Sequence, residues 1–311
     1  MELFDFAASK SKDCRDYVDG ALDPTGFATH SYSKSNQIHG LAGTTPILRW
    51  AGSKKKLLRH LIAASPAKFN TYLEPFVGSG VLYLRLNPKR AILSDINEHL
   101  IQAYETVRAE PKLVWDCLMA WSPTSEFYYH LREKQTTQLN DLERAARFIY
   151  LNRYCFNGVY RTNLKGEFNV SRGKGNLGIP DWDIFSAFAE KLIASKIENC
   201  DFEKTVNRAK NNDYIYLDPP YAEVGKRDRG EYGIGTFRPS DVSRLLDSIL
   251  RADKRGAKIL LSYSADHLDL NLLKGWNIYE LTVMRNVSGF TGSRRNADEI
   301  LVSNYQWNNK T

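Results

Sequence analysis

One segment constrains the fold of this 311-residue chain more than any other, because a strand, a tight turn, a helix and a second strand follow one another in it. The pattern predicts a strand over residues 70–76, a glycine-containing turn over 77–80, a helix over 81–86 and a buried strand over 91–94, ending at Asp95. Parallel strands need such a crossover connection, usually a helix. The segment therefore predicts an α/β fold.

The same alternation of strands and helices returns after a long stretch, residues 111–200, that is mostly helical in pattern. Alternation on both sides of a helical insert indicates a mainly parallel α/β sheet with a separate helical lobe. Further helices are predicted over residues 53–64, 98–108, 141–150, 183–195 and 240–251. Ser53 is the candidate cap of the first of these helices, and Pro239-Ser240 caps the last. Further strands are predicted over residues 214–217, 258–263, 276–283 and 299–302.

These patterns predict three parts. Residues 1–45 are rich in Ser, Thr, Gly, Asp and Asn without a sustained period, which is typical of a flexible N-terminal extension. Residues 46–110 and 201–311 together are expected to form the α/β domain, and residues 111–200 an inserted helical domain.

Composition narrows the class of protein. With 42% hydrophobic and 25% charged residues, the chain has the make-up of an ordinary globular protein. It contains no apolar run long enough for a membrane span and no apolar signal core near its start, so we expect neither membrane insertion nor export. The four cysteines and six histidines show no metal-ligand spacing, which predicts a reduced intracellular protein without a metal site.

Charge is distributed unevenly along the chain. Residues 1–45 carry four basic and six acidic side chains, a net charge of −2. Because the whole chain has a net charge of +7, the remaining residues carry +9. An excess of basic side chains of this size favours a polyanionic partner such as nucleic acid.

The predicted turn at 77–80 belongs to the run Glu74-Pro75-Phe76-Val77-Gly78-Ser79-Gly80. Paired glycines before a helix let the backbone approach a ligand closely at the helix N-terminus. A dinucleotide fingerprint would need a third glycine at position 83, where Tyr83 stands. Asp95, at the end of the next strand, can accept hydrogen bonds from both hydroxyls of a ribose; alternatively, the glycines only make a tight turn and Asp95 caps the following helix.

The most specific motif is Asp218-Pro219-Pro220-Tyr221, directly after an apolar strand and therefore at the edge of the sheet where ligands bind in open α/β folds. Two prolines remove two N–H donors and fix the backbone. The Asp218 carboxylate and the Pro219 carbonyl remain as acceptors beside the aromatic ring of Tyr221. This set suits a planar base with an exocyclic amine, whose lone pair becomes available for attack when its hydrogens are accepted. The alternative is a Pro-Pro turn capped by Asp218.

Residues 152–178 form a Gly- and Asn-rich stretch without regular period, and a loop of this length inside a compact domain is usually functional. Five basic residues stand against one acidic residue there, with Tyr154, Phe156 and Tyr160 between them. Phosphate contacts would supply affinity for DNA, whereas Arg161 and Asn157 could read base edges. Alternatively, the aromatic residues pack the helical lobe and the cations are solvated. Lys226, Arg227, Arg229 and Tyr232, in loop 222–238, are a second candidate DNA surface.

Taken together, the order of these motifs over roughly residues 46–307 resembles the Dam-type DNA adenine N6-methyltransferases. The matching residues are Trp50-Ala51-Gly52-Ser53-Lys54, the run 74–80, Asp95-Ile96-Asn97 and Asp218–Tyr221, with further matches at Asn152-Arg153-Tyr154, Asn157-Gly158, Arg161, 166–170 and 298–301. The resemblance implies a Rossmann-like S-adenosylmethionine-dependent methyltransferase sheet with the helical insert as target-recognition domain. It implies methyl transfer from S-adenosylmethionine to N6 of a flipped adenine in double-stranded DNA.

The resemblance also implies roles for particular residues. Catalysis would fall to Asp218, Pro219, Pro220 and Tyr221. The cofactor site would comprise Trp50, Gly52, Lys54, Glu74, Phe76, Gly78, Gly80, Asp95, Ile96 and Asp218. DNA contacts would come from Asn157, Arg161, Lys165, Ser171, Arg172 and Lys174. No metal is expected.

The family pattern leaves some properties open. Ser171 and Lys174 stand where GATC-reading members commonly carry proline and arginine, so the recognition sequence is not specified. Cytosine N4 methylation is an alternative, because cytosine presents a similar exocyclic amine; a DNA-binding protein with vestigial catalysis is another. We expect a monomer in the cytoplasm, associated with the nucleoid, and the sequence does not indicate whether a cognate restriction enzyme exists.

Overall fold

A computed structural model of the chain describes residues 45–163, 165–174, 178–222, 237–264, 268–286 and 294–307. The predicted N-terminal extension lies outside these ranges apart from its last residue, and so does most of loop 222–238 with its four candidate DNA contacts. No helix in the described part is long and apolar enough to cross a membrane.

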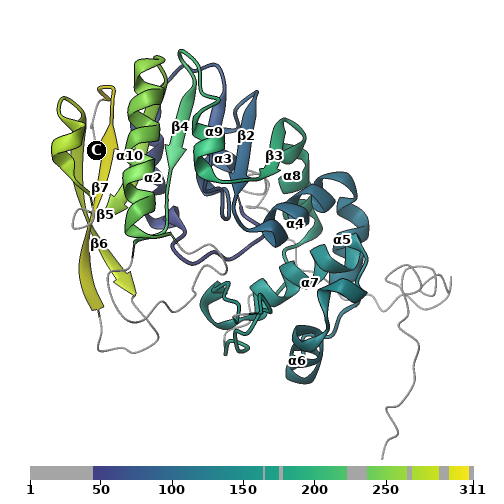
Figure 1. Cartoon of the computed structure of the whole chain (residues 1–311). Coiled ribbons are helices and arrows are strands. Elements are labelled where there is room, and N and C mark those ends of the chain that lie inside the picture. The colour runs from purple at the N-terminus through teal and green to yellow at the C-terminus, as the bar shows by residue number, and fades with distance from the viewer. Residues whose placement is uncertain are drawn as a thin grey trace, which may run out of the picture.

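Within the described residues, the fold centres on a seven-stranded sheet in the order β3-β2-β1-β4-β5-β7-β6 (Figure 1). The strands are β1 (Tyr72–Glu74), β2 (Ala91–Asp95), β3 (Ser195–Asn199), β4 (Tyr214–Leu217), β5 (Lys258–Ser264), β6 (Asn277–Asn286) and β7 (Arg294–Ser303). The first five strands in sequence pair in parallel, whereas β7 is antiparallel to both β5 and β6. The predicted α/β fold with a mainly parallel sheet is confirmed.

Both faces of the sheet are covered, as the alternation of side chains along each strand requires. On β4, Tyr214 and Tyr216 belong to the core on one face, and Ile215 and Leu217 to the core on the other. The first face packs against η2 (Lys54–Leu57), α2 (Leu58–Ala64), α3 (Val81–Leu86) and α4 (Glu98–Ala109). The second packs against α9 (Phe202–Val206), α10 (Pro239–Lys254) and η6 (Leu270–Leu273).

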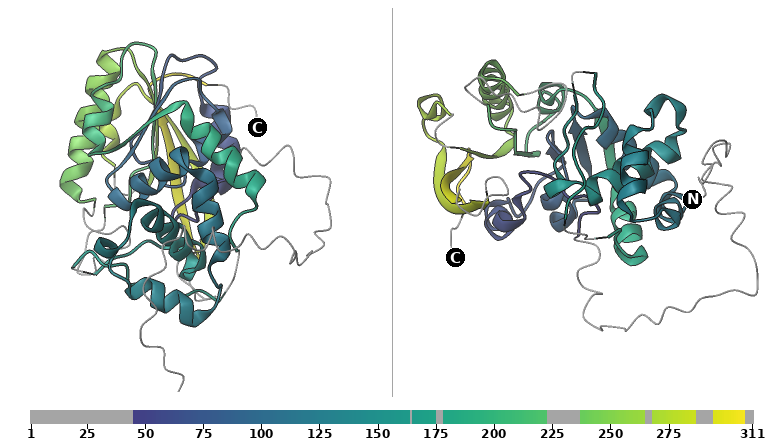
Figure 2. Two further views of the ribbon diagram at one scale, coloured as in Figure 1. Left: turned by 90° about the vertical axis from the view of Figure 1, so that its right-hand side faces the viewer. Right: turned by 90° about the horizontal axis from the view of Figure 1, so that it is seen from below.

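The remaining helices form a lobe beside the β3 edge of the sheet (Figures 1 and 2). They are α5 (Pro111–Ala120), α6 (Ser125–Glu133), η3 (Thr136–Gln138), α7 (Asp141–Tyr154), η4 (Phe156–Gly158) and α8 (Trp182–Ile193). A capping box fixes the start of α7, where the Asn140 side chain accepts from the Glu143 backbone N–H and the Glu143 carboxylate accepts from the Asn140 N–H. This central helix packs against α4 and α5 and so joins the lobe to the sheet domain.

Several predicted boundaries differ from the structure. Residues 152–154, assigned to the loop, are the last turn of α7, and β3, assigned to the helical insert, is a strand of the sheet. Ser53 makes no side-chain cap, and α10 begins at Pro239 with Arg238 as its N-cap. Strand β1 is shorter than predicted. Strand β7 begins at residue 294 rather than 299, because pairing with β6 continues through a polar segment that has no hydrophobic alternation.

Candidate active site

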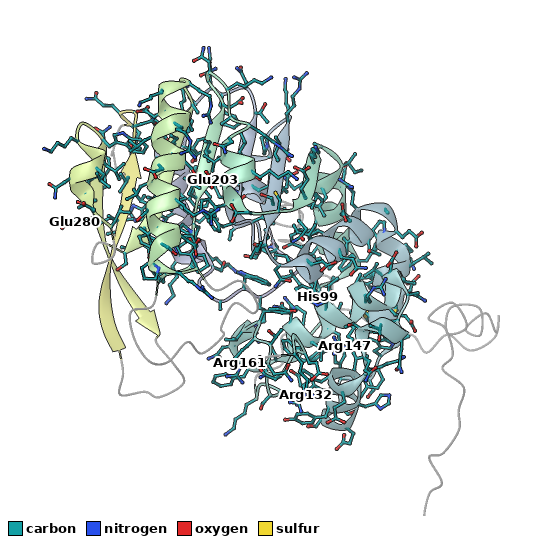
Figure 3. The ribbon with its side chains drawn as sticks, viewed as in Figure 1. His99, Arg132, Arg147, Arg161, Glu203 and Glu280 are labelled. Carbon is teal, nitrogen blue, oxygen red and sulfur yellow. The ribbon has the colours of Figure 1, made fainter. Side chains whose placement is uncertain are left out.

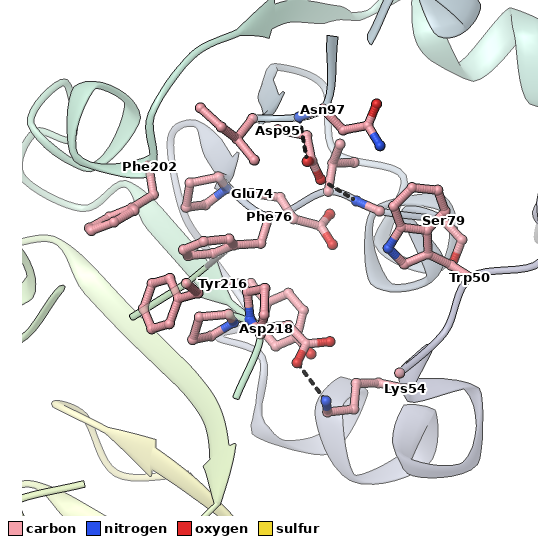
Figure 4. Close-up of a pocket in the computed structure, with 18 of the residues that line it drawn as sticks. Trp50, Lys54, Glu74, Phe76, Ser79, Asp95, Asn97, Phe202, Tyr216 and Asp218 are labelled. Carbon is pink, nitrogen blue, oxygen red and sulfur yellow. Dashed lines mark hydrogen bonds and ion pairs between the residues drawn. The ribbon is translucent and has the colours of Figure 1, made fainter. Parts of the chain in front are cut away.

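A pocket of about 410 Å³ opens beside the carboxyl ends of β1 and β4 (Figure 4). Strand β1 lies between β2 and β4, so the chain order reverses there, which is where open α/β sheets form their ligand crevice. Every residue that the sequence predicted for the cofactor site or for catalysis lines this pocket. The structure thus brings together segments from residue 50 to residue 221.

The glycine turn shapes one wall of the pocket. Gly78 and Gly80 have φ angles of 44° and 63°, in the left-handed region that side chains disfavour. A Cβ atom on Gly78 would lie 2.7 Å from Cδ1 of Trp50, so only glycine lets the indole pack on this turn. The Trp50 ring in turn stacks on Tyr160, with 6.2 Å between ring centroids. Trp50 therefore connects the pocket wall to the segment after α7.

Asp95 is held by the backbone around it. Its Oδ2 accepts from the Gly78 N–H at 3.1 Å and its Oδ1 from the Asn97 N–H at 3.0 Å (Figure 4). Burial raises the pKa of Asp95 from 3.8 to about 6, although these backbone donors act in the opposite direction. Asp95 does not cap α4, as one reading of the sequence had it, because the Asn97 side chain accepts from the Leu100 N–H instead.

The ammonium group of Lys54 joins two carboxylates at the base of the Asp-Pro-Pro-Tyr motif. Nζ lies 2.5 Å from Oδ1 of Asp218 and 3.2 Å from Oε1 of Glu299 on β7. Burial by itself would lower the pKa of Lys54, but the charges of Asp218 and Glu299 outweigh burial and hold the pKa above its ordinary value. Lys54 is therefore a buried cation of the pocket.

Glu299 also fixes the tyrosine of the motif. Its Oε2 accepts from the Tyr221 hydroxyl at 3.1 Å, and its Oε1 accepts from the Ser262 hydroxyl at 2.5 Å. The Tyr221 ring stacks on Tyr263, with 5.5 Å between centroids, and the Tyr263 hydroxyl accepts from the Ala222 N–H. The ring of Tyr221 thus has a fixed plane and a fixed tilt. Sequence reasoning quoted Glu299 as a family match but assigned it no place in the site.

An aromatic wall closes the other end of the pocket. Phe76 stacks on Phe202 at 5.4 Å between centroids and meets Phe237 edge to face at 5.9 Å. Ile96, 51% exposed, stands at the rim. Sequence reasoning missed Phe202 and Phe237, since both belong to short segments without a motif. Phe237 stands just before a predicted helix, which was the one available signal, whereas the strand before Phe202, β3, was not predicted.

The predicted DNA-reading loop leaves α7 and is partly ordered by its own backbone. Isolated bridges pair Cys155 with Arg172 and Thr162 with Phe168. Arg161 donates through Nε to Oδ1 of Asn169 at 2.8 Å, and Figure 3 shows it on the same lobe as Arg132 and Arg147.

The side chains of the loop divide between core and surface. Tyr154 and Tyr160 are buried, whereas Phe156 is 45% exposed. Packing of the lobe therefore accounts for two of the three interleaved aromatic residues. Of the predicted DNA contacts, Arg161 and Arg172 are half-buried, and Asn157, Lys165, Ser171 and Lys174 are exposed.

Comparison with known proteins gives a consistent result. Residues 50–287 match the family model described as D12 class N6 adenine-specific DNA methyltransferase. The chain is 33% identical to the Type II methyltransferase M1.LlaDCHI of Lactococcus lactis, over 84% of this chain and 95% of that protein. It is 33% identical to the Type II methyltransferase M.MjaIII of Methanocaldococcus jannaschii, over 84% and 99%. It is 32% identical to a DNA adenine methylase of Haemophilus influenzae, over 83% and 92%.

Proposed function

Because the chain belongs to the D12 class of N6 adenine-specific DNA methyltransferases, we propose that it uses S-adenosylmethionine to methylate an adenine flipped from double-stranded DNA into the pocket at Asp218. Family membership makes the protein a site-specific DNA adenine methyltransferase. The observation that carries the proposal is the convergence of the glycine turn, Asp95 and the Asp-Pro-Pro-Tyr motif on one pocket.

The donor set of the pocket fits S-adenosylmethionine. A volume of about 410 Å³ lies within the range of cofactor sites, roughly 300–1,000 Å³. The Asp95 carboxylate is placed to accept from ribose hydroxyls, and the Phe76 and Phe202 rings offer an apolar wall for an adenine. The Asp218 carboxylate supplies negative charge for a cationic ligand group, and Glu74, whose pKa burial raises well above its ordinary value, supplies a neutral carboxyl group. When bound, S-adenosylmethionine supplies a methyl group made electrophilic by its sulfonium.

The residues of the motif act on the target amine. The Asp218 carboxylate and the Pro219 carbonyl accept its two hydrogens, which biases the nitrogen toward tetrahedral geometry and frees its lone pair. Tyr221, fixed by Glu299 and Tyr263, stacks on the base. With the Lys54 ammonium at 2.5 Å, Asp218 acts as an oriented acceptor rather than a strong base, and it takes the surplus proton after methylation.

DNA is held by the loop that follows α7. Lys165, Lys174 and Arg172 bind phosphates, and Arg161, oriented by Asn169, reads a base edge together with Asn157. Ser171 lies on the same surface. The protein works as a monomer on nucleoid DNA in the cytoplasm, because one asymmetric basic loop beside one pocket suffices to bind and modify a single base.

An Asp218→Ala variant tests this assignment. Methyl transfer from S-adenosylmethionine to DNA should fall below detection, whereas DNA affinity in a gel-shift or anisotropy titration should stay within a few-fold of wild type. Wild-type DNA affinity should also respond to S-adenosylmethionine. Full activity in the variant would refute the role of Asp218, and DNA binding indifferent to S-adenosylmethionine, without turnover, would favour a vestigial enzyme.

A further inference from the structure

One buried hydroxyl group in the pocket has no hydrogen-bond partner among the described residues: that of Tyr216. Tyr216 lies on β4, two residues before Asp218, and therefore on the same face of the strand. Its side chain lines the pocket next to Asp218 (Figure 4) and is only 2% exposed. The catalytic scheme above makes no use of it.

The hydroxyl groups of three other tyrosines on the parallel strands, unlike that of Tyr216, have hydrogen-bond partners. The Tyr72 hydroxyl donates to Glu74 at 2.9 Å, the Tyr214 hydroxyl lies 3.1 Å from that of Ser65, and the Tyr263 hydroxyl accepts from Ala222 at 3.1 Å. A buried hydroxyl without a partner costs about 1–3 kcal/mol, so native structures rarely keep one without a reason. A ligand that completes the bond is such a reason when the group faces a pocket.

The groups around Tyr216 indicate which charge a ligand group bonded to its hydroxyl would carry. Register places Tyr216 beside Glu74, because the preceding residues of β1 and β4 pair as Tyr72 with Tyr214 and Leu73 with Ile215. Burial, together with the charges of Asp218, Glu74 and Glu299, holds the pKa of Tyr216 well above its ordinary value, so the hydroxyl stays neutral. A neutral hydroxyl can donate or accept, and the two carboxylates of Asp218 and Glu299 around the single Lys54 ammonium leave a net negative charge that favours a cationic donor, for which the hydroxyl oxygen is the acceptor.

We propose that Tyr216 is a cofactor-positioning residue whose hydroxyl oxygen accepts a hydrogen bond from the α-ammonium group of the methionine part of S-adenosylmethionine, beside the Glu74 side chain. This inference rests on the proposed function, because it concerns the same pocket and the same cofactor. The amino-acid part of S-adenosylmethionine would then be anchored at β4, two residues before Asp218.

Binding of three ligands to Tyr216→Phe by isothermal titration tests the proposal. S-adenosylmethionine and S-adenosylhomocysteine both carry the α-ammonium group, so both should bind about tenfold more weakly, as expected for loss of one hydrogen bond to a charged group. Methylthioadenosine lacks the amino-acid part and should bind with wild-type affinity. Tyr214→Phe is the matched control on the same strand and face, and it should bind all three ligands as wild type does.

Thermal unfolding without ligand gives a second readout. Tyr216→Phe should melt at the wild-type temperature or above, because the change removes an unsatisfied hydroxyl, whereas Tyr214→Phe should melt lower, because it loses the contact with Ser65. Unchanged binding of all three ligands, equal weakening of all three, or weakening of S-adenosylmethionine alone would overturn the proposal. Failure of the wild-type protein to bind S-adenosylmethionine would instead overturn the proposed function itself.

Discussion

At the scale of single residues, the state of Asp95 sets how the pocket responds to pH. Burial raises its pKa to about 6 in the free pocket, whereas hydrogen bonds from ribose hydroxyls would favour the ionised form and lower the pKa when ligand is bound. A ligand that binds the ionised form better must bind more tightly as the pH rises. Affinity for S-adenosylmethionine should therefore be constant above about pH 7 and fall by up to tenfold per unit below about pH 6.

Titration of wild type and Asp95→Asn with S-adenosylmethionine between pH 5 and 8 measures this effect. The variant should bind more weakly at pH 8 and show a flatter pH dependence, since its amide does not titrate. A wild-type affinity that stays constant across pH 6, or an inflection retained in Asp95→Asn, would show that another group is responsible.

Residues that carry a local motif were predictable at this scale, and residues brought in by folding were not. Gly78, Asp95 and Asp218 each belong to a short run with its own chemical logic, and all three line the pocket. Glu299 enters from β7, 81 positions after Asp218 in the sequence, and its partners Tyr221 and Ser262 become visible only in the folded chain. Tyr216 was hidden because a tyrosine in an apolar strand is indistinguishable from core.

At the scale of elements, the loop after α7 is the part of the structure that we propose reads the DNA sequence. The hydrogen bond from Arg161 to Asn169 points to a side chain that is oriented before DNA arrives, whereas the exposed side chain of Lys165 makes no such bond within the described part of the chain. An oriented guanidinium can pair with a guanine in two hydrogen bonds, and an ammonium mainly supplies charge.

Binding to a library of DNA sites distinguishes these two roles. Arg161→Ala should relax preference at one base position by about 1–3 kcal/mol and leave the others intact. Lys165→Ala, the matched control from the same loop, should weaken all sites uniformly and reduce the salt dependence by about one phosphate contact. Uniform weakening in Arg161→Ala would reassign that residue to the phosphate backbone.

Element boundaries were predicted well where hydrophobic periodicity and apolar runs are strong. Helix α3 and strand β4 have the predicted bounds, because apolar residues and sharp turns define both ends. Strand β7 was predicted too short and β3 was assigned to the wrong part of the chain. Both contain polar or charged residues at many positions, and their strand conformation depends on pairing with neighbours that local sequence does not reveal.

At the scale of the whole molecule, the sheet order explains why residues so far apart can act together. The reversal of chain order at β1 and β4 opens the crevice, η2 brings Lys54 to its base, and β7 adds Glu299 from the antiparallel side. The Trp50–Tyr160 stack then links the crevice to the loop of the helical lobe. The α/β class followed from the sequence, but this link required the tertiary structure.

If this pocket methylates adenine, the modified base identifies the reaction. Unmethylated DNA is incubated with the protein and S-adenosylmethionine, digested to nucleosides and analysed by mass spectrometry, with Asp218→Ala as control. We expect N6-methyladenine with wild type and none with the variant. N4-methylcytosine, or N6-methyladenine formed equally by Asp218→Ala, would contradict it.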